Sequence, residues 1–423
     1  MLRRKVGLLK IKTMKKILLI TISALLTIPT FAQYEEPGFY RVKNKGAANR
    51  YITIVNDRVY KAFKSIGVSE LYQFMAVNAL RTVKDPVTDP GSIIYISGES
   101  GDLSLEGQGM QTRNLLKGYH LVSTGSALCS EYQGQMIYLM DNFEIGEEKN
   151  ATVGVGVNKV RGNAGTYASW EIKKIDNDQE YLGVKPDITI GDKYYTTLYT
   201  SFAYQLPEGM KAYYIDEHQY SNIAEPAAVL KEISGKVPAA TPVILECSSN
   251  KVEDNKLKPL SSAEAPAAIS GNELKGIYFC YVKFSFDDRS RGESTVENMV
   301  EEKNVTDYNE STMRVLGSVD GKLALVVAKD NQLEVTNKGK YLLANKAYFP
   351  IKATEASATK GGIKLVDKAS FDNLTAISSA TYEQAPAANG VYTLTGVRMK
   401  ADNSTEGLPS GIYIINGKKV IVK

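Results

Sequence analysis

The sequence predicts an all-β protein made of two globular domains and a small C-terminal β tail. Short runs of β-branched and aromatic residues recur along the chain, and turns rich in Gly, Asn and Asp separate them. Tyrosine is abundant, with 26 Tyr against 11 Phe and one Trp, and its apolar ring with a polar tip suits half-buried strands. Short strands at this spacing are typical of sandwiches and barrels.

The N-terminus has the pattern of a secretory signal peptide, residues 1–32. Lys15 and Lys16 precede the uncharged apolar run 17–28, and small residues then lead to Ala32. The run is shorter than the roughly 20 apolar residues that span a bilayer. We therefore expect cleavage between Ala32 and Gln33, export to the outside or the cell surface, and no transmembrane span afterwards. A membrane anchor or a buried helix is the alternative.

The positive net charge belongs to this signal. The chain has 51 Lys and Arg against 47 Asp and Glu, a net charge of +4. Residues 1–32 contain seven of the basic residues and no acidic residue, so residues 33–423 carry a net charge of −3. Nucleic-acid binding needs basic residues clustered on the folded protein. The charge pattern thus predicts no nucleic-acid partner.

Cysteine usage predicts neither a metal site nor a disulfide framework. The three cysteines, Cys129, Cys247 and Cys280, have no CxxC spacing. A Cys247–Cys280 disulfide and three buried thiols both fit the sequence, and the second interpretation is favoured because free cysteine is commonly buried. Stability is therefore expected from apolar cores.

The first domain begins with a hairpin pattern over 38–55, in which apolar and polar residues alternate on both sides of a Gly-containing turn. Leu71, Phe74, Met75 and Leu80 have nearly helical spacing, which predicts one short helix over 71–80. Further strands are expected at 92–97, 102–106, 119–123, 136–140, 151–157 and 170–175.

The residues Gly38-Phe39-Tyr40-Arg41-Val42-Lys43-Asn44 and Arg50-Tyr51-Ile52 resemble the opening of the ricin-type β-trefoil of secreted bacterial proteins. The resemblance covers about 38–175 and implies a β-trefoil-like domain over 33–180. The lectin signature Gln-x-Trp is missing, because Ala168 stands two residues before Trp170. If the domain binds sugar, the candidate stacking residues are Tyr40, Tyr51 and Trp170. The alternative is that all three belong to the core.

The second domain, 184–370, is predicted to be β-sandwich-like. Its strands are expected at 194–200, 210–215, 228–233, 242–247, 276–286, 323–328 and 346–351, with an insertion at 287–308. Residues 37–365 resemble a two-domain family of secreted or surface proteins of the Bacteroidetes. That resemblance implies an architecture and a location, and no activity.

The third unit, 376–423, is predicted to be a linker followed by a β tail. Residues 376–388 are rich in Ala and Ser, and strands are expected at 391–398, 408–415 and 418–423. The tail resembles the C-terminal sorting or attachment tail of Bacteroidetes proteins that is linked to type IX secretion. The resemblance implies that export machinery binds this tail. An ordinary terminal hairpin is the alternative.

The sequence predicts no catalytic residue, no metal ligand and no cofactor. The two histidines, His120 and His218, do not lie in an HExxH motif, and GxSxG, P-loop and dinucleotide-binding motifs are missing. The leading hypothesis is a secreted or cell-surface, non-catalytic protein that binds a glycan or a surface protein. The alternatives are a carbohydrate-active enzyme, whose two carboxylates can be far apart in sequence, and a structural or adhesin component.

Overall fold

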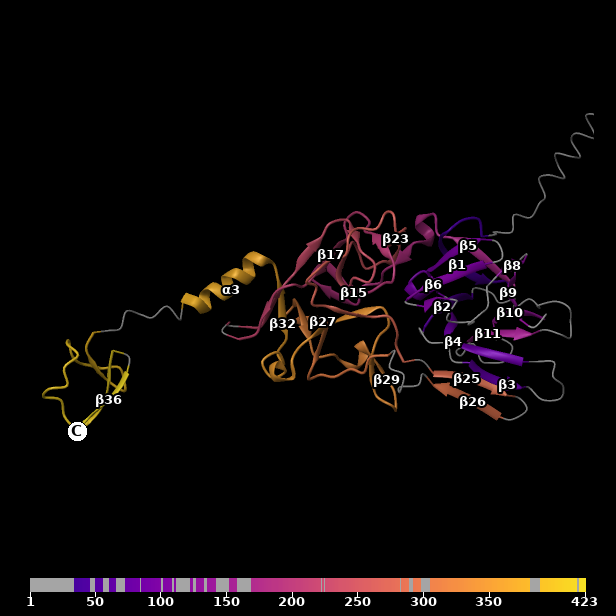
Figure 1. Ribbon diagram of the computed structural model, residues 1–423. Helices are drawn as coiled ribbons and strands as arrows, with labels where there is room; N and C mark the ends of the chain where they lie inside the picture. Colours follow the sequence, from indigo (N-terminus) through magenta and orange to yellow (C-terminus); the bar gives the residue numbers. More distant parts are fainter. Residues whose placement is uncertain are drawn as a thin grey trace, which may run out of the picture.

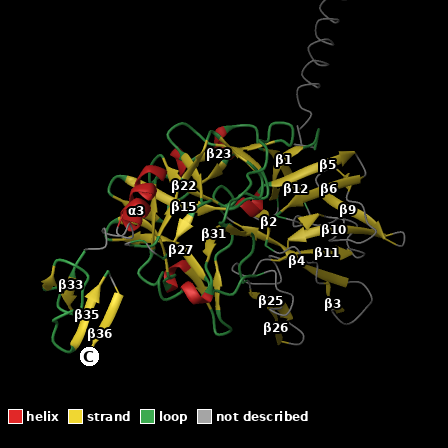
Figure 2. Ribbon diagram, turned by 60° about the vertical axis from the view of Figure 1, so that its left-hand side comes forward, coloured by secondary structure: helices red, strands yellow, loops and turns green. Residues whose placement is uncertain are grey.

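The computed structural model is built almost entirely of β-sheets (Figures 1 and 2), which confirms the predicted all-β class. We call residues 34–180 the N-terminal unit, 181–366 the middle unit and 389–423 the tail. The structure describes residues 34–45, 50–55, 61–65, 73–83, 85–99, 102–108, 110–111, 122–124, 127–132, 135–141, 152–157, 169–221, 223, 225–281, 283–288, 292–297, 305–380, 389–416 and 418–423.

The strands of the N-terminal unit join in one antiparallel sheet around β1, which pairs with β2, β5 and β12. The predicted hairpin over 38–55 is confirmed by the β1–β2 pair. The trefoil arrangement stays a prediction. The strands are β1 (Gly38–Asn44), β2 (Tyr51–Ile54), β3 (Lys61–Ser65), β4 (Gln73–Val83), β5 (Ile94–Glu99), β6 (Asp102–Gly107), β7 (Met110–Gln111), β8 (Val122–Thr124), β9 (Ala127–Tyr132), β10 (Gln135–Asp141), β11 (Thr152–Val157) and β12 (Trp170–Lys174).

The predicted helix over 71–80 is wrong, because this segment contributes to the long strand β4. An isolated helix of about ten residues is only marginally stable in water. β4 instead pairs with three other strands, β2, β3 and β11, and so satisfies its backbone groups along most of its length. Long-range pairing therefore decides the structure of this segment.

The middle unit consists of three layers of sheet, and the five-stranded sheet lies between the other two. The first sheet has the order β13 (Leu182–Gly183), β23 (Lys256–Leu260), β16 (Ala203–Gln205) and β21 (Lys236–Val237). The second has the order β14 (Ile188–Ile190), β15 (Lys193–Leu198), β22 (Val243–Cys247), β17 (Lys211–Tyr214) and β20 (Lys231–Ile233). The third has the order β18 (His218–Gln219), β19 (Ala227–Val229), β32 (Ile363–Val366), β28 (Lys322–Val326), β27 (Met313–Val319), β31 (Lys346–Pro350) and β24 (Lys275–Ile277).

Strand β22 shows why the central sheet is apolar on both faces. Val243, Leu245 and Cys247 face the core between the first and second sheets. Ile244 lies in the core between the second and third sheets. Because side chains alternate across a strand, a nearly continuous apolar run is what a sheet covered on both faces requires.

Cys247 and Cys280 form no disulfide bond, and the side chain of Cys129 lies outside the described part of the structure. Burial raises the pKa of Cys247 to about 12 and that of Cys280 to about 11. The thiolate is the reactive form of cysteine, so both side chains act as small apolar core residues. This agrees with the favoured interpretation of the sequence.

The N-terminal and middle units each contribute an apolar residue to the core of the other unit. Phe279, which follows β24, is buried in the core of the N-terminal unit beside Trp170. Conversely, Ile93 is buried in a core of the middle unit, and Phe39 packs against the same core. The contact between the units is therefore an apolar interior. The domain bounds expected from the sequence stay predictions.

Two hairpins, one helix and the tail complete the described structure. Helix α3 (Lys368–Ala380) packs on β19 through Phe371 and includes the start of the segment predicted to be a linker. The tail, drawn in yellow at the C-terminal end in Figure 1, is a four-stranded antiparallel sheet with the order β34, β33, β35, β36. The remaining strands are β25 (Lys283–Asp288), β26 (Gly292–Glu297), β29 (Leu333–Val335), β30 (Lys340–Leu342), β33 (Val391–Thr393), β34 (Arg398–Lys400), β35 (Gly411–Ile415) and β36 (Lys418–Val422).

Among the described residues, no helix combines the length and the apolar character needed to cross a membrane. The predicted signal peptide and its cleavage site between Ala32 and Gln33 lie outside the described residues. Their role stays a prediction.

Candidate functional site

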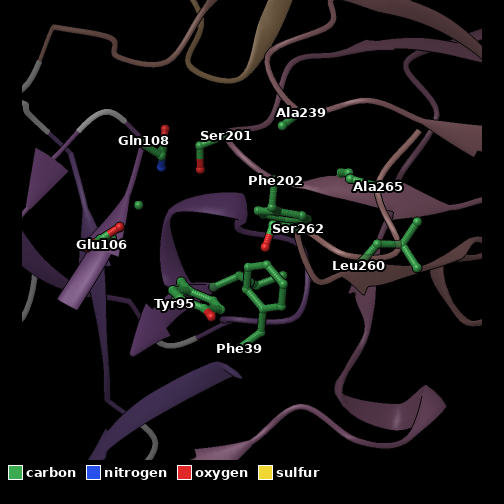
Figure 3. A pocket seen from close by; sticks show the side chains of 13 residues that line it. Phe39, Tyr95, Glu106, Gln108, Ser201, Phe202, Ala239, Leu260, Ser262 and Ala265 are labelled. Carbon is green, nitrogen blue, oxygen red and sulfur yellow. The ribbon is translucent and has the colours of Figure 1, made fainter. Parts of the chain in front are cut away.

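A cavity of about 550 Å³ lies where the N-terminal unit meets the middle unit (Figure 3). Its walls combine aromatic and aliphatic side chains with a carboxylate, an amide and hydroxyl groups. This volume is within the usual range for small-ligand sites. The lining residues are Phe39, Ile93, Tyr95, Glu106, Gly107, Gln108, Ser201, Phe202, Ala203, Ala239, Leu260, Ser262 and Ala265.

The N-terminal wall of the cavity is a row of side chains on adjacent strands. Phe39 on β1 is paired with Tyr95 on β5, and Tyr95 is paired with Glu106 on β6. Directly opposed residues project from the same face of a sheet, so the register alone places two aromatic rings and a carboxylate side by side. Figure 3 shows these three side chains along one side of the cavity.

Phe202 closes the aromatic part of the cavity from the middle unit. The ring of Phe39 meets Tyr95 edge to face, with centroids 5.2 Å apart and planes at 67°. It also contacts the ring of Phe202, with centroids 5.6 Å apart. Edge-to-face packing of this kind is the favoured geometry for aromatic pairs. The rings therefore form a fixed apolar wall.

The opposite end of the cavity is polar. Ser104 Oγ donates a hydrogen bond of 3.1 Å to Glu106 Oε1. Gln108 is buried, and its Nε2 donates to the carbonyl of Ile54 at 3.0 Å while its Oε1 accepts from Asn345 Nδ2 at 3.1 Å. Gln108 thus links the N-terminal unit to the middle unit beside the cavity.

Arg41 ties together distant segments of the N-terminal unit beside Phe39. It projects from the same face of β1 as Phe39, since the two are separated by one residue. Its guanidinium is buried and forms an ion pair with Glu180 at 3.4 Å, and it also donates to Ser92 Oγ and to the carbonyls of Pro86 and Glu180. Burial lowers the pKa of Arg41, and the nearby Glu180 partly offsets this effect.

The structure does not bring Tyr40, Tyr51 and Trp170 together at a cavity. Tyr40 and Trp170 are both 2% exposed in the core of the N-terminal unit. Their polar atoms bond to backbone, Tyr40 to Glu36 O at 2.7 Å and Trp170 to Leu139 O at 2.8 Å. The covered rings cannot stack on a sugar, so these two positions match the alternative of core residues. Tyr51 is half-buried, with Lys43 Nζ 5.8 Å from its ring centroid.

Four lining residues, Phe39, Tyr95, Glu106 and Phe202, were not among the candidates predicted from the sequence. The available signal was the alternation along β1, where Tyr40 and Val42 belong to one face and Phe39 and Arg41 to the other. That alternation separates the faces, but it does not say which face lies against a second unit.

A second cluster of polar side chains lies around His218 on β18, at the edge of the third sheet and outside the lining of this cavity. Its Nδ1 lies 2.6 Å from Glu273 Oε2, and its ring stacks on Tyr220 with centroids 4.6 Å apart. The side chain is partly exposed. His120 lies outside the described residues. In the part of the chain that the structure describes, no three His, Cys, Asp or Glu side chains are grouped as metal ligands.

No family model matches this chain, and no curated protein matches it. Among solved structures, the chain is similar to that of a mosquitocidal holotoxin, with 12% sequence identity and a TM-score of 0.22. The match covers 75% of this chain and 34% of the toxin chain. The chain thus spans about a third of the toxin's length, and a similarity this low carries no functional argument.

Proposed function

We propose that this chain is a non-catalytic binding protein that takes a glycan into the cavity between its N-terminal and middle units. The observation that carries the proposal is the row Phe39, Tyr95 and Glu106, which together with Phe202 lines one cavity with an aromatic wall and a carboxylate. Aromatic rings contact the apolar C–H faces of a sugar, and carboxylate, amide and hydroxyl groups exchange hydrogen bonds with its hydroxyls.

A segment of a surface protein is the second candidate ligand. The same cavity would accept an apolar side chain against the wall that Phe39, Tyr95 and Phe202 form, with Glu106 accepting a hydrogen bond from a backbone N–H or a polar side chain of the segment. The carbohydrate-active enzyme remains the alternative function. Most glycoside hydrolases use two carboxylates, and Glu106 is the single acidic residue among the described lining residues of this cavity. This composition favours binding over hydrolysis.

The proposed location is outside the cell or on its surface, as the signal pattern of residues 1–32 indicates. The resemblance of the tail to Bacteroidetes sorting tails supports recognition by export machinery. Removing residues 381–423, which leaves helix α3 intact, is expected to change localisation and to leave the N-terminal and middle units folded. The structural or adhesin role is the third alternative, and it predicts self-assembly without a defined ligand.

The test is a glycan array and a peptide array probed with the chain 33–423. The best ligand is then measured by calorimetry against Glu106→Gln, which keeps the shape and removes the charge. A hydrogen bond to a charged group contributes about 1.5–3 kcal/mol, so the affinity is expected to fall by about 10-fold to 100-fold. Tyr95→Ala is expected to weaken binding as well.

Two further variants locate the site. Glu171→Gln changes an acid on β12 of the same sheet that does not line the cavity, and it is expected to leave the affinity unchanged. Tyr51→Ala tests the half-buried ring chosen from the sequence. Loss of binding in Tyr51→Ala with unchanged binding in Glu106→Gln would move the site to β2. Release of a cleaved product would replace the binding proposal with the enzyme alternative.

A further inference from the structure

The tail concentrates the exposed apolar side chains of the described structure. Six large apolar residues are exposed in the described part of the chain, and all but Val335 lie in the tail. The tail members are Leu394, Val397, Met399, Ile412 and Ile421. Apolar side chains that gather on one exposed face usually mark a binding surface.

Strand register places the centre of this surface on the outer face of the tail sheet. Ile412 on β35 is paired with Ile421 on β36, and their side chains are 40% and 69% exposed. The opposite face holds the small core of the tail, in which Val391, Tyr413 and Ile415 are buried. Ile414 lies on the outer face too, paired with Tyr392 on one side and Lys419 on the other.

The tail is basic, and the register places two of its basic residues, Arg398 and Lys419, on the outer face, whereas Lys400 and Lys418 are paired with Val391 and Ile415 of the core face. Residues 389–423 contain five basic and two acidic residues, a net charge of +3, whereas residues 33–388 carry a net charge of −6. The basic residues lie on the edge strands of the sheet, Arg398 and Lys400 on β34 and Lys418 and Lys419 on β36, or directly after it at Lys423. The acidic residues Asp402 and Glu406 lie in the connection between β34 and β35.

We propose that the outer face of the tail sheet binds the surface of an anionic lipid bilayer. An apolar centre bordered by basic residues is the arrangement that lies in a membrane interface, where apolar side chains enter the headgroup region and lysines meet anionic lipids. The charge contrast between the tail and residues 33–388 would orient the tail toward the bilayer and the acidic units away from it. This inference does not depend on ligand binding in the cavity.

Two alternative roles of the outer face are tested together with lipid binding. Lysines on an edge strand also prevent edge-to-edge aggregation, and this role needs no lipid. A second copy of the chain could cover the outer face. Lysine protection predicts no vesicle binding at all, and a second copy predicts a dimer that depends on Ile412 and Ile421.

The experiment is flotation of the chain 33–423 with vesicles. This chain contains all described residues and lacks the apolar run 17–28, which would bind lipid by itself. Vesicles of phosphatidylcholine alone are compared with vesicles that contain phosphatidylglycerol. We expect binding to the anionic vesicles only, and weaker binding at high salt because the Debye length falls.

Matched variants assign the binding to the outer face. Each lysine near an anionic surface contributes about a fivefold change in partition, so Lys419→Gln is expected to lower binding by about fivefold. Lys418→Gln is expected to have a smaller effect, because Lys418 is paired with Ile415 of the core face. Ile412→Ser with Ile421→Ser is expected to lower it at least about tenfold. Lys258→Gln with Lys322→Gln and Val335→Ser change exposed residues of the middle unit and are expected to have no effect.

Hydrogen exchange across β35 and β36 shows whether the tail sheet stays folded in each variant. We expect it to stay folded, because the substituted side chains are exposed. Equal binding to neutral and anionic vesicles would overturn the proposal. So would binding that the tail variants leave unchanged. A dimer that is lost in Ile412→Ser with Ile421→Ser, without any vesicle binding, would overturn it in favour of a second copy.

Discussion

Arg41 is a charged residue whose burial is unfavourable in itself and is compensated by an ion pair and hydrogen bonds. An isolated buried charge is strongly unfavourable. Arg41 is tolerated because Glu180 and several carbonyl and hydroxyl oxygens surround it. Removing the guanidinium would take a buried donor away from Ser92 and from the Glu180 carbonyl, whereas Pro86 O keeps its hydrogen bond from Ser92 Oγ and the Glu180 carboxylate keeps Lys173.

We therefore expect Arg41→Met to destabilise the protein by about 1–3 kcal/mol, the usual cost of leaving a buried hydrogen-bonding group without its partner. The measurement is urea unfolding followed by fluorescence of Trp170, the one tryptophan of the chain, which is buried in the N-terminal core. Lys173→Gln is the control, since Lys173 contacts the same Glu180 from an exposed position and is expected to contribute at most about 1 kcal/mol. Equal effects of the two variants would contradict this account.

A one-residue difference explains why the candidate site could be predicted only in part. The alternation along β1 was visible in the sequence, and so was its aromatic content. Tyr40 and Phe39 are neighbours, and they project from opposite faces of the strand. Which face becomes core depends on β5, β12 and the middle unit, all of which lie far away in sequence. Local composition cannot supply that information.

At the scale of elements, strands were predicted well where turn residues bound them closely. The expected strands at 102–106, 136–140 and 418–423 correspond to β6, β10 and β36. Two segments were predicted incorrectly. β4 has helical spacing, but pairing with three distant strands makes it a strand. The Ala- and Ser-rich start of the predicted linker, 376–380, instead belongs to helix α3, which packs on β19.

Helix α3 depends on Asp367, which precedes its first residue. Asp367 accepts hydrogen bonds from the backbone N–H of Ser370 at 2.8 Å and from its hydroxyl at 3.1 Å. These bonds lower the pKa of Asp367. A carboxyl group with a lowered pKa in the folded state contributes stability above its unfolded pKa of about 3.9 and loses it as the pH falls through the folded pKa.

We expect Asp367→Ala to increase amide exchange in α3 at neutral pH by removing this N-cap. The difference between the two proteins is expected to shrink below about pH 3.9 and to vanish as the pH falls through the lowered folded pKa of Asp367, where the wild-type carboxylate becomes protonated. The measurement is hydrogen exchange across 368–380. Asp372→Asn, which removes an exposed ion pair with Lys368 inside the helix, serves as the control with a smaller expected effect. A pH-independent difference between wild type and Asp367→Ala would show that the cap is not ionic.

At the scale of the whole molecule, the exchange of core residues couples units that the sequence separates near residue 180. Phe279 belongs to the middle unit in sequence and to the N-terminal core in space. Ile93 is placed in the reverse way. The cavity between the units is therefore lined by two parts that hold each other in position, which suits a preformed ligand site.

This coupling predicts that Phe279→Ala destabilises the N-terminal unit, although that unit ends about a hundred residues earlier. Removing a buried phenylalanine costs about 3–5 kcal/mol, and the loss is expected in the unfolding transition that Trp170 fluorescence reports. Phe371→Ala is the matched control, because Phe371 is equally buried between α3 and β19. It is expected to leave the Trp170 transition unchanged. An unchanged Trp170 midpoint in a folded Phe279→Ala protein would mean that the units are stable independently.

In the expected case, a fragment that ends at Glu180 lacks Phe279 and should fail to fold alone. Ligand binding therefore has to be studied in a chain that contains both units.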